Sequence, residues 1–76
     1  MMQKDIIEII SEELNVDKTT INETTRLRED LNVDSLDVVE LIMRIEETFD
    51  VTVSDEAATK METVGDIIEY VKGLKS

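Results

Sequence analysis

The spacing of apolar residues after Asp34 is the strongest constraint on the fold. They recur every three or four positions from Ser35 to about Asp50, which is the period of an α-helix. Asp34 precedes this run and Asp37 follows three residues later, so one carboxylate can cap free backbone N–H groups and the other lies near the positive end of the helix dipole. The sequence therefore predicts a capped helix that begins at an exposed serine, Ser35.

This helix has two apolar faces when its residues are placed on a helical projection. The larger face predicts packing against a core. The narrower one lies among acidic residues and begins beside Ser35, so we interpret it as a docking surface; the alternative is that it only widens the core. The core face comprises Val38, Leu41, Ile42, Ile45 and Phe49, and the second stripe comprises Leu36, Val39 and Met43.

A first helix is predicted from Met2 to Leu14, because its apolar residues also follow the helical period. Asn15 can end it, since asparagine tolerates the left-handed conformation found after helix ends. Residues 15–34 are mostly polar and predict a long irregular loop, with at most one helical turn in 24–31. Four apolar residues are expected to anchor this loop: Val16, Ile21, Leu27 and Leu31.

The remaining third of the chain predicts an extended connection and two more helices. Residues 50–54 have no second strand to pair with, so Val51 or Val53 is expected to turn inward. A short helix is expected over residues 55–61, with Ser54 or Asp55 as its cap. A fourth helix, opened by Thr63 and Asp66 and ended by Gly73, has Val64, Ile67, Ile68, Val71 and Leu74 as its apolar face.

These elements predict an all-α fold: a four-helix bundle of three main helices and one short helix, with a long loop between helices 1 and 2. Its 76 residues are expected to form one domain, 1–76. The formal charge of -11 argues against nucleic acid and anionic membranes as partners and favours basic protein surfaces. No apolar stretch is long enough to span a bilayer, so we expect a cytoplasmic protein.

The chain is not expected to be an enzyme, because it has no histidine and no cysteine. No lysine has a spacing that would activate Ser35 as a nucleophile. The run from Asp30 to Asp34 matches three ligand positions of a calcium-binding loop, but Ser35 stands where glycine is required and Leu41 where glutamate is required, so no metal site is predicted. Ser35 is instead interpreted as a residue modified by a separate, basic enzyme, the alternative being an ordinary helix-start serine.

Residues 31–43, together with 45–49, resemble the signature around Asp-Ser-Leu of the acyl carrier proteins, and the likeness covers the whole chain. The resemblance implies a bacterial-type carrier of fatty acid synthesis. A phosphopantetheinyl transferase would use coenzyme A and magnesium to attach 4'-phosphopantetheine to Ser35. The arm ends in a thiol that carries acyl groups as thioesters between enzymes, which suits a chain without cysteine.

The resemblance also implies two further sets of site residues. Family members shelter the acyl chain between their helices and dock on basic patches of fatty acid synthesis enzymes; a monomer is expected. The implied acyl pocket comprises Val38, Ile42, Ile45, Ala58, Met61 and Ile67, and the implied docking surface comprises Asp34, Leu36, Asp37, Val39, Glu40, Met43, Glu46 and Glu47.

Three residues depart from the family pattern: Asn32 replaces a common glycine, Val33 a small residue and Ser54 a frequent proline. These departures leave the subfamily open. A specialised carrier of D-alanine, a polyketide or a nonribosomal peptide is one alternative. An acidic helical adaptor that carries no prosthetic group is another.

Most of the net negative charge lies in the middle of the chain. Eleven acidic residues and only two basic ones, Arg44 and Lys60, lie between Glu29 and Glu62, a balance of -9. Because this repulsion is screened by ions, added salt or millimolar divalent cation should raise the melting temperature, as measured by circular dichroism. A melting temperature that is independent of ionic strength would contradict the prediction.

Overall fold

The computed structural model describes residues 2–75, and its regular elements are helical. Among these residues extended pairing is limited to one isolated bridge, between Arg26 and Thr63. The all-helical prediction is therefore confirmed, with three long helices and a short one. The elements are α1 (Met2–Leu14), the 3₁₀ helix η1 (Lys18–Thr20), α2 (Ser35–Phe49), α3 (Asp55–Thr59) and α4 (Val64–Lys75).

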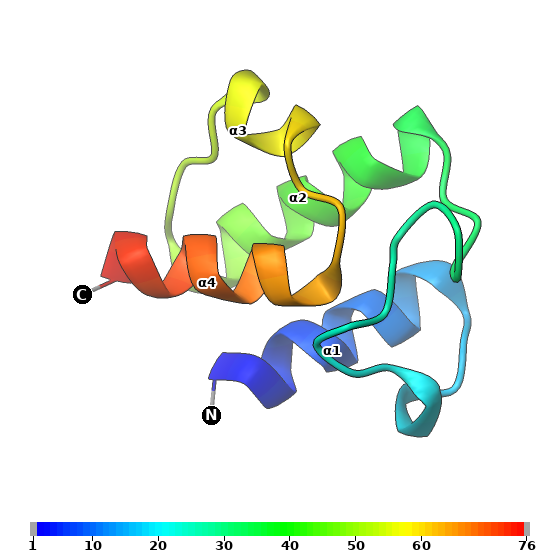
Figure 1. The fold of residues 1–76 in the computed structure, drawn as a ribbon. Helices are drawn as coiled ribbons and strands as arrows, with labels where there is room; N and C mark the ends of the chain where they lie inside the picture. The colour runs from blue at the N-terminus through cyan, green and yellow to red at the C-terminus, as the bar shows by residue number, and fades with distance from the viewer. Residues whose placement is uncertain (1, 76) are drawn as a thin grey trace.

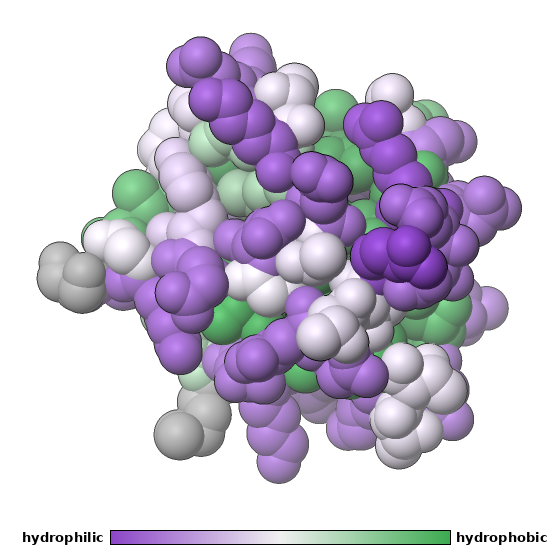
Figure 2. Space-filling model, viewed as in Figure 1, coloured by the Kyte–Doolittle hydropathy of each residue, from purple (hydrophilic) through white to green (hydrophobic). Residues whose placement is uncertain are grey.

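The core lies where α1 packs against α2 and α4 (Figure 1). Burial of each large aliphatic side chain there contributes about 1.5–3 kcal/mol, which matters in a chain without disulfides. Figure 2 shows a face that is mostly hydrophilic, with its apolar side chains in separate patches. The buried cluster comprises Ile6, Ile9, Ile10, Ile21, Leu27, Val33, Leu41, Ile45, Val64, Ile67, Ile68 and Val71.

The loop from residue 15 to 34 is more ordered than its composition predicts. Asp17 caps η1, an element that the sequence did not indicate, by accepting from the Thr19 N–H at 2.9 Å. Backbone bonds then tie the loop to the chain at the start of α4. The Leu27 N–H donates to the Glu62 carbonyl at 2.8 Å, and the Val64 N–H donates to the Thr25 carbonyl at 2.9 Å.

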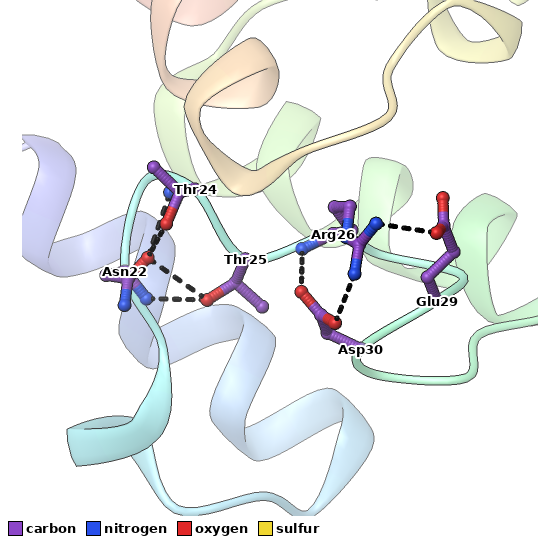
Figure 3. Close-up of polar contacts among 6 residues, drawn as sticks. All are labelled: Asn22, Thr24, Thr25, Arg26, Glu29 and Asp30. Carbon is purple, nitrogen blue, oxygen red and sulfur yellow. Dashed lines mark hydrogen bonds and ion pairs between the residues drawn. The ribbon is translucent and has the colours of Figure 1, made fainter.

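Two side chains brace the middle of this loop (Figure 3). The Asn22 Oδ1 accepts from the Thr24 N–H at 2.9 Å, and the Asn22 N–H donates to the Thr25 hydroxyl at 2.9 Å. The hydroxyl of Thr25, which is buried, accepts the second of these bonds and itself donates to the Asn22 Oδ1 at 3.4 Å, so it is satisfied. The loop therefore folds through its own polar side chains as well as its apolar anchors.

Arg26 closes the next turn (Figure 3). Its guanidinium lies 2.7 Å from a Glu29 carboxylate oxygen and 3.3 Å from one of Asp30. The other Asp30 oxygen accepts from the Arg26 backbone N–H at 2.8 Å, and this bond is the main reason that the pKa of Asp30 is lowered. The helical turn expected in 24–31 is present as this hydrogen-bonded turn and not as a helix.

Left-handed backbone marks three element boundaries. Asn15 after α1, Asn32 before α2 and Asp50 after α2 each have a φ of 56°. The left-handed geometry expected at Asn15 is confirmed, and Asn32, which stands where a glycine is common, has the same geometry, because short polar side chains adopt it at low cost. Asp50 was expected to end α2, but its conformation had no sequence signal.

Four sequence expectations need correction. Val33 is buried and anchors the loop, although only four other residues were expected to do so. Leu74 is 43% exposed and does not complete the core face of α4. Gly73 lies inside α4, which continues to Lys75, and a Cβ built at this position would meet nothing within 4 Å, so the position does not require glycine. The short helix α3 ends at Thr59 instead of Met61.

The start of α4 matches the predicted capping pair. The Asp66 carboxylate accepts from the N–H groups of Glu62 and Thr63 at 2.9 and 3.0 Å, and the Thr63 hydroxyl accepts from the Asp66 N–H at 3.1 Å. The two backbone bonds, the Glu62 one first, lower the pKa of Asp66. The carboxylate thus stabilises the fold in its ionised form.

Asp66→Asn should therefore destabilise the protein in a pH-dependent way, by about 0.5–2 kcal/mol at pH 7. Because the pKa of Asp66 is lowered by folding, its contribution is present above the ordinary value of 3.8 and is lost as the pH falls below it. Urea unfolding of both proteins at pH 7 and below pH 3.8 measures the difference. Glu69→Gln, on the same helix, is the matched control, and a pH-independent difference would contradict the assignment.

Candidate functional site

Ser35 is the first residue of α2 and is held there by a reciprocal capping box. The Asp37 N–H donates to the Asp34 carboxylate at 2.9 Å, and the Asp34 N–H donates to the Asp37 carboxylate at 3.1 Å. Ser35 is exposed, and no residue in the range 2–75 makes a hydrogen bond with its hydroxyl. The hydroxyl is therefore free to react without breaking a structural bond.

The approach to α2 explains why the serine lies at the surface. Asn32 reverses the chain in the left-handed conformation, and the buried Val33 follows it. The Val33 N–H donates to the Leu27 carbonyl at 3.2 Å, which ties this residue to the anchored loop. The next residue, Asp34, is extended and exposed, so the helix has to begin outside the core.

A mostly apolar crevice lies between α2 and α3, beside Ser35. It consists of two adjoining hollows of about 260 and 140 Å³, and we call them together the α2/α3 crevice. The larger hollow includes Ser35 and Arg28, and the smaller one reaches Ile42 and Val53. The residues common to both are Val38, Val39, Asp55 and Ala58.

The six acyl-pocket candidates fall into two groups. Val38, Ile42 and Ala58 line the α2/α3 crevice. Ile45 and Ile67 are almost completely buried in the main core. Met61 is partly buried and borders other hollows, between α3 and α4 and beside Arg28. The structure therefore brings half of the candidates together at the crevice.

The predicted docking surface runs along the exposed side of α2. Leu36, Val39 and Met43 are 65%, 53% and 54% exposed, so the second stripe of the helix does not widen the core. Glu40 and Glu47 are exposed beside them. Acidic and apolar side chains thus share one accessible face.

Three acidic members of this surface also have structural roles. Asp34 and Asp37 cap α2, as described above. Glu46 is partly buried and accepts from the Val53 backbone N–H at 2.8 Å, which holds the connection between α2 and α3. Sequence reasoning placed Glu46 on the docking surface only. Its contact with Val53, seven residues later and beyond the end of α2, is not indicated by the helical period.

Sequence reasoning assigned no role to two arginines, one that joins α2 to α1 and one that lines the crevice. Arg44 of α2 bonds to Glu12 at 2.9 Å and to Glu13 at 3.4 Å, which joins α2 to α1 and raises the pKa of Arg44, mainly through Glu12. Arg28 belongs to the loop and lines the α2/α3 crevice with Ser35. Its sequence position gave no signal, because the loop path is set by tertiary contacts.

The two aspartates that begin and end the calcium-loop pattern, Asp30 and Asp34, make contacts within the protein. The Asp30 carboxylate pairs with Arg26, and the Asp34 carboxylate caps α2. Within residues 2–75 there is no group of three or more His, Cys, Asp or Glu side chains arranged to hold a metal ion.

The site fits a phosphate ester. The Ser35 hydroxyl is exposed at a helix N-terminus, where backbone N–H groups and the helix dipole favour an added anion. The crevice beside it offers apolar walls to a flexible chain. Together the fold and the site define a small helical domain with an exposed serine hydroxyl beside a mostly apolar crevice.

Comparison with known proteins identifies the family. Residues 4–71 match the family model of the phosphopantetheine attachment site. The chain is 48% identical to the acyl carrier protein of Chlamydia felis, covering 93% of this chain and 91% of that one. It is 47% identical to the acyl carrier protein of Wolinella succinogenes, with 90% of each covered. A structure from Mycobacterium tuberculosis, provisionally assigned as an acyl carrier protein, superposes with a TM-score of 0.91 at 33% identity, covering 96% of this chain and 97% of that one.

The chain belongs to the acyl carrier protein family. It is a carrier and not an enzyme: it bears phosphopantetheine and carries acyl groups among the enzymes of fatty acid synthesis. Across residues 2–75, no helix has the combination of length and apolar character needed to cross a membrane.

Proposed function

We propose that Ser35 is the residue that carries the 4'-phosphopantetheine arm. The observation that carries this proposal is the exposed, unbonded hydroxyl at the start of α2, held in place by the Asp34 and Asp37 capping box. The bound group supplies a terminal thiol for thioester formation, which the chain itself lacks because it has no cysteine. The residues of the chain position this arm and the acyl group and leave the chemistry to partner enzymes.

The acidic face of α2 is proposed to dock on basic patches of the phosphopantetheinyl transferase and of the fatty acid synthesis enzymes. Complementary charge speeds association, and exposed apolar side chains within it give short-range contact. The protein is proposed to dock as a monomer in the cytoplasm. The surface comprises Asp34, Leu36, Asp37, Val39, Glu40, Met43, Glu46 and Glu47.

The α2/α3 crevice is proposed as the entrance to the acyl pocket. Val38, Ile42 and Ala58 line it, and none of the five residues of α3 is buried. Because an element with few buried contacts opens at low cost, α3 can move away from α2 to admit a chain. Deeper accommodation would then involve the other candidates, Ile45, Met61 and Ile67.

Ser35→Ala should abolish loading and leave the fold unchanged. Ser35 is exposed and unbonded, so the change in unfolding free energy should stay within about 0.5 kcal/mol. Intact mass after incubation with coenzyme A, magnesium and a broad-specificity transferase measures the adduct. A wild-type chain that gains no phosphopantetheine would favour the adaptor alternative, and an adduct on the alanine variant would move the attachment to another residue.

Glu40→Lys should slow loading at low salt by about threefold to tenfold, because it reverses a charge on the proposed docking face. Glu69→Lys makes the same change in net charge on α4 and should have little effect. Initial rates of adduct formation at low and high salt provide the measurement. Equal rates for Glu40→Lys and the wild type at low salt would show that this face does not steer the transferase.

A further inference from the structure

Arg28 is a cation in the wall of the crevice beside the attachment serine. It lines the hollow of about 260 Å³ that includes Ser35, and also a neighbouring hollow of about 270 Å³. The side chain is exposed, and the structure of residues 2–75 contains no ion pair or hydrogen bond to its guanidinium. The guanidinium is therefore available to an anion that enters the larger hollow.

The acidic residues next to Arg28 in sequence are already engaged. Glu29 and Asp30 pair with Arg26 (Figure 3). The Asp34 carboxylate caps α2 by accepting from the Asp37 N–H. Asp55 lines the same hollow from α3, but no ion pair within 4.0 Å joins it to Arg28. Arg28 is thus the cation that lines this hollow, and none of these four carboxylates forms an ion pair with it.

A phosphate on Ser35 would enter acidic surroundings. Asp34 and Asp37 flank the serine at the start of α2, and Asp55 faces it across the crevice. The helix N-terminus offsets part of this repulsion, but its effect is modest at an exposed position. A guanidinium offers a second favourable contact, because its planar donors match phosphate oxygens in pairs.

We propose that Arg28 binds the phosphate of the phosphopantetheine group carried on Ser35. This inference rests on the proposed attachment at Ser35. Arg28 is a positioning residue: it contacts the root of the arm and takes no part in thioester chemistry. Its contribution is to fix the phosphate at the mouth of the α2/α3 crevice against the repulsion of the surrounding carboxylates.

The test uses the full chain in unloaded and loaded forms. The chain has three arginines, so its guanidinium Nε–H signals are few in a proton–nitrogen spectrum. Loading the wild type should shift the signal that is missing from Arg28→Gln, and should leave those of Arg26 and Arg44 in place. The shift should be largely lost at about 1 M salt, where the Debye length is about 3 Å.

The phosphorus resonance of the loaded protein gives a second readout, on the partner of the contact. At low salt it should differ between the wild type and Arg28→Gln, with Arg28→Lys between them, because lysine keeps the charge but not the paired donors. Lys60→Gln is the matched control: it removes one positive charge from the end of α3, outside the α2/α3 crevice, and should match the wild type.

Intact mass separates the two proposals. A wild type without an adduct would overturn attachment at Ser35 and this inference with it. A normal adduct combined with an unmoved Arg28 signal, or with equal phosphorus resonances in the wild type and Arg28→Gln, would overturn the role of Arg28 alone. A loss of stability in unloaded Arg28→Gln with an unchanged phosphorus resonance would indicate that Arg28 stabilises the fold by interacting with Asp55. That result would also overturn the proposed contact between Arg28 and the phosphate.

Discussion

The position of Ser35, the proposed attachment residue, depends on the backbone bonds that tie the long loop to the chain at the start of α4. The bonds from Leu27 to Glu62 and from Val64 to Thr25 fix the loop against a segment nearly forty residues away. The chain enters α2 directly from that fixed loop, through Val33. A third bond runs from the Gly65 N–H to the Glu23 carbonyl at 2.9 Å. Glycine permits this close approach of the two backbones, because a Cβ at Gly65 would lie only 2.9 Å from the same oxygen. This anchoring therefore sets where α2 begins and where Arg28 lines the α2/α3 crevice.

Acidic side chains have structural and functional uses on the same helix. The carboxylates of Asp34 and Asp37 satisfy backbone N–H groups at the start of α2, and Glu46 holds the connection to α3. The same negative charge repels itself and lowers stability, which Arg44 offsets in part by joining α2 to α1. The proposed docking surface is thus maintained at a cost to the fold, and the core of aliphatic residues compensates for that cost.

The short helix α3 is the least anchored wall of the site. Ser54 caps it, with its hydroxyl accepting from the Ala57 N–H at 3.1 Å, but none of its residues is buried. Ile42 and Val53 are buried beneath it and lie outside the main core cluster. The molecule therefore combines a tightly packed core of α1, α2 and α4 with one lightly anchored wall, which is the arrangement that the proposed acyl entrance requires.

The sequence by itself determined the four α-helices, the caps at the starts of α2 and α4, and the placement of Ser35 at the start of α2. These features are local: apolar period, capping residues and left-handed asparagines act within a few positions, and the absence of cysteine and histidine excludes whole classes of chemistry. Only the tertiary structure decided how the loop folds, that Val33 is buried, that Leu74 is exposed and that Arg28 faces the crevice. Those outcomes depend on contacts between residues far apart in the chain, which no local pattern records. The acyl-pocket candidates show the same limit, because core and crevice positions share one helical period, and only packing separated Val38 and Ile42 from Ile45.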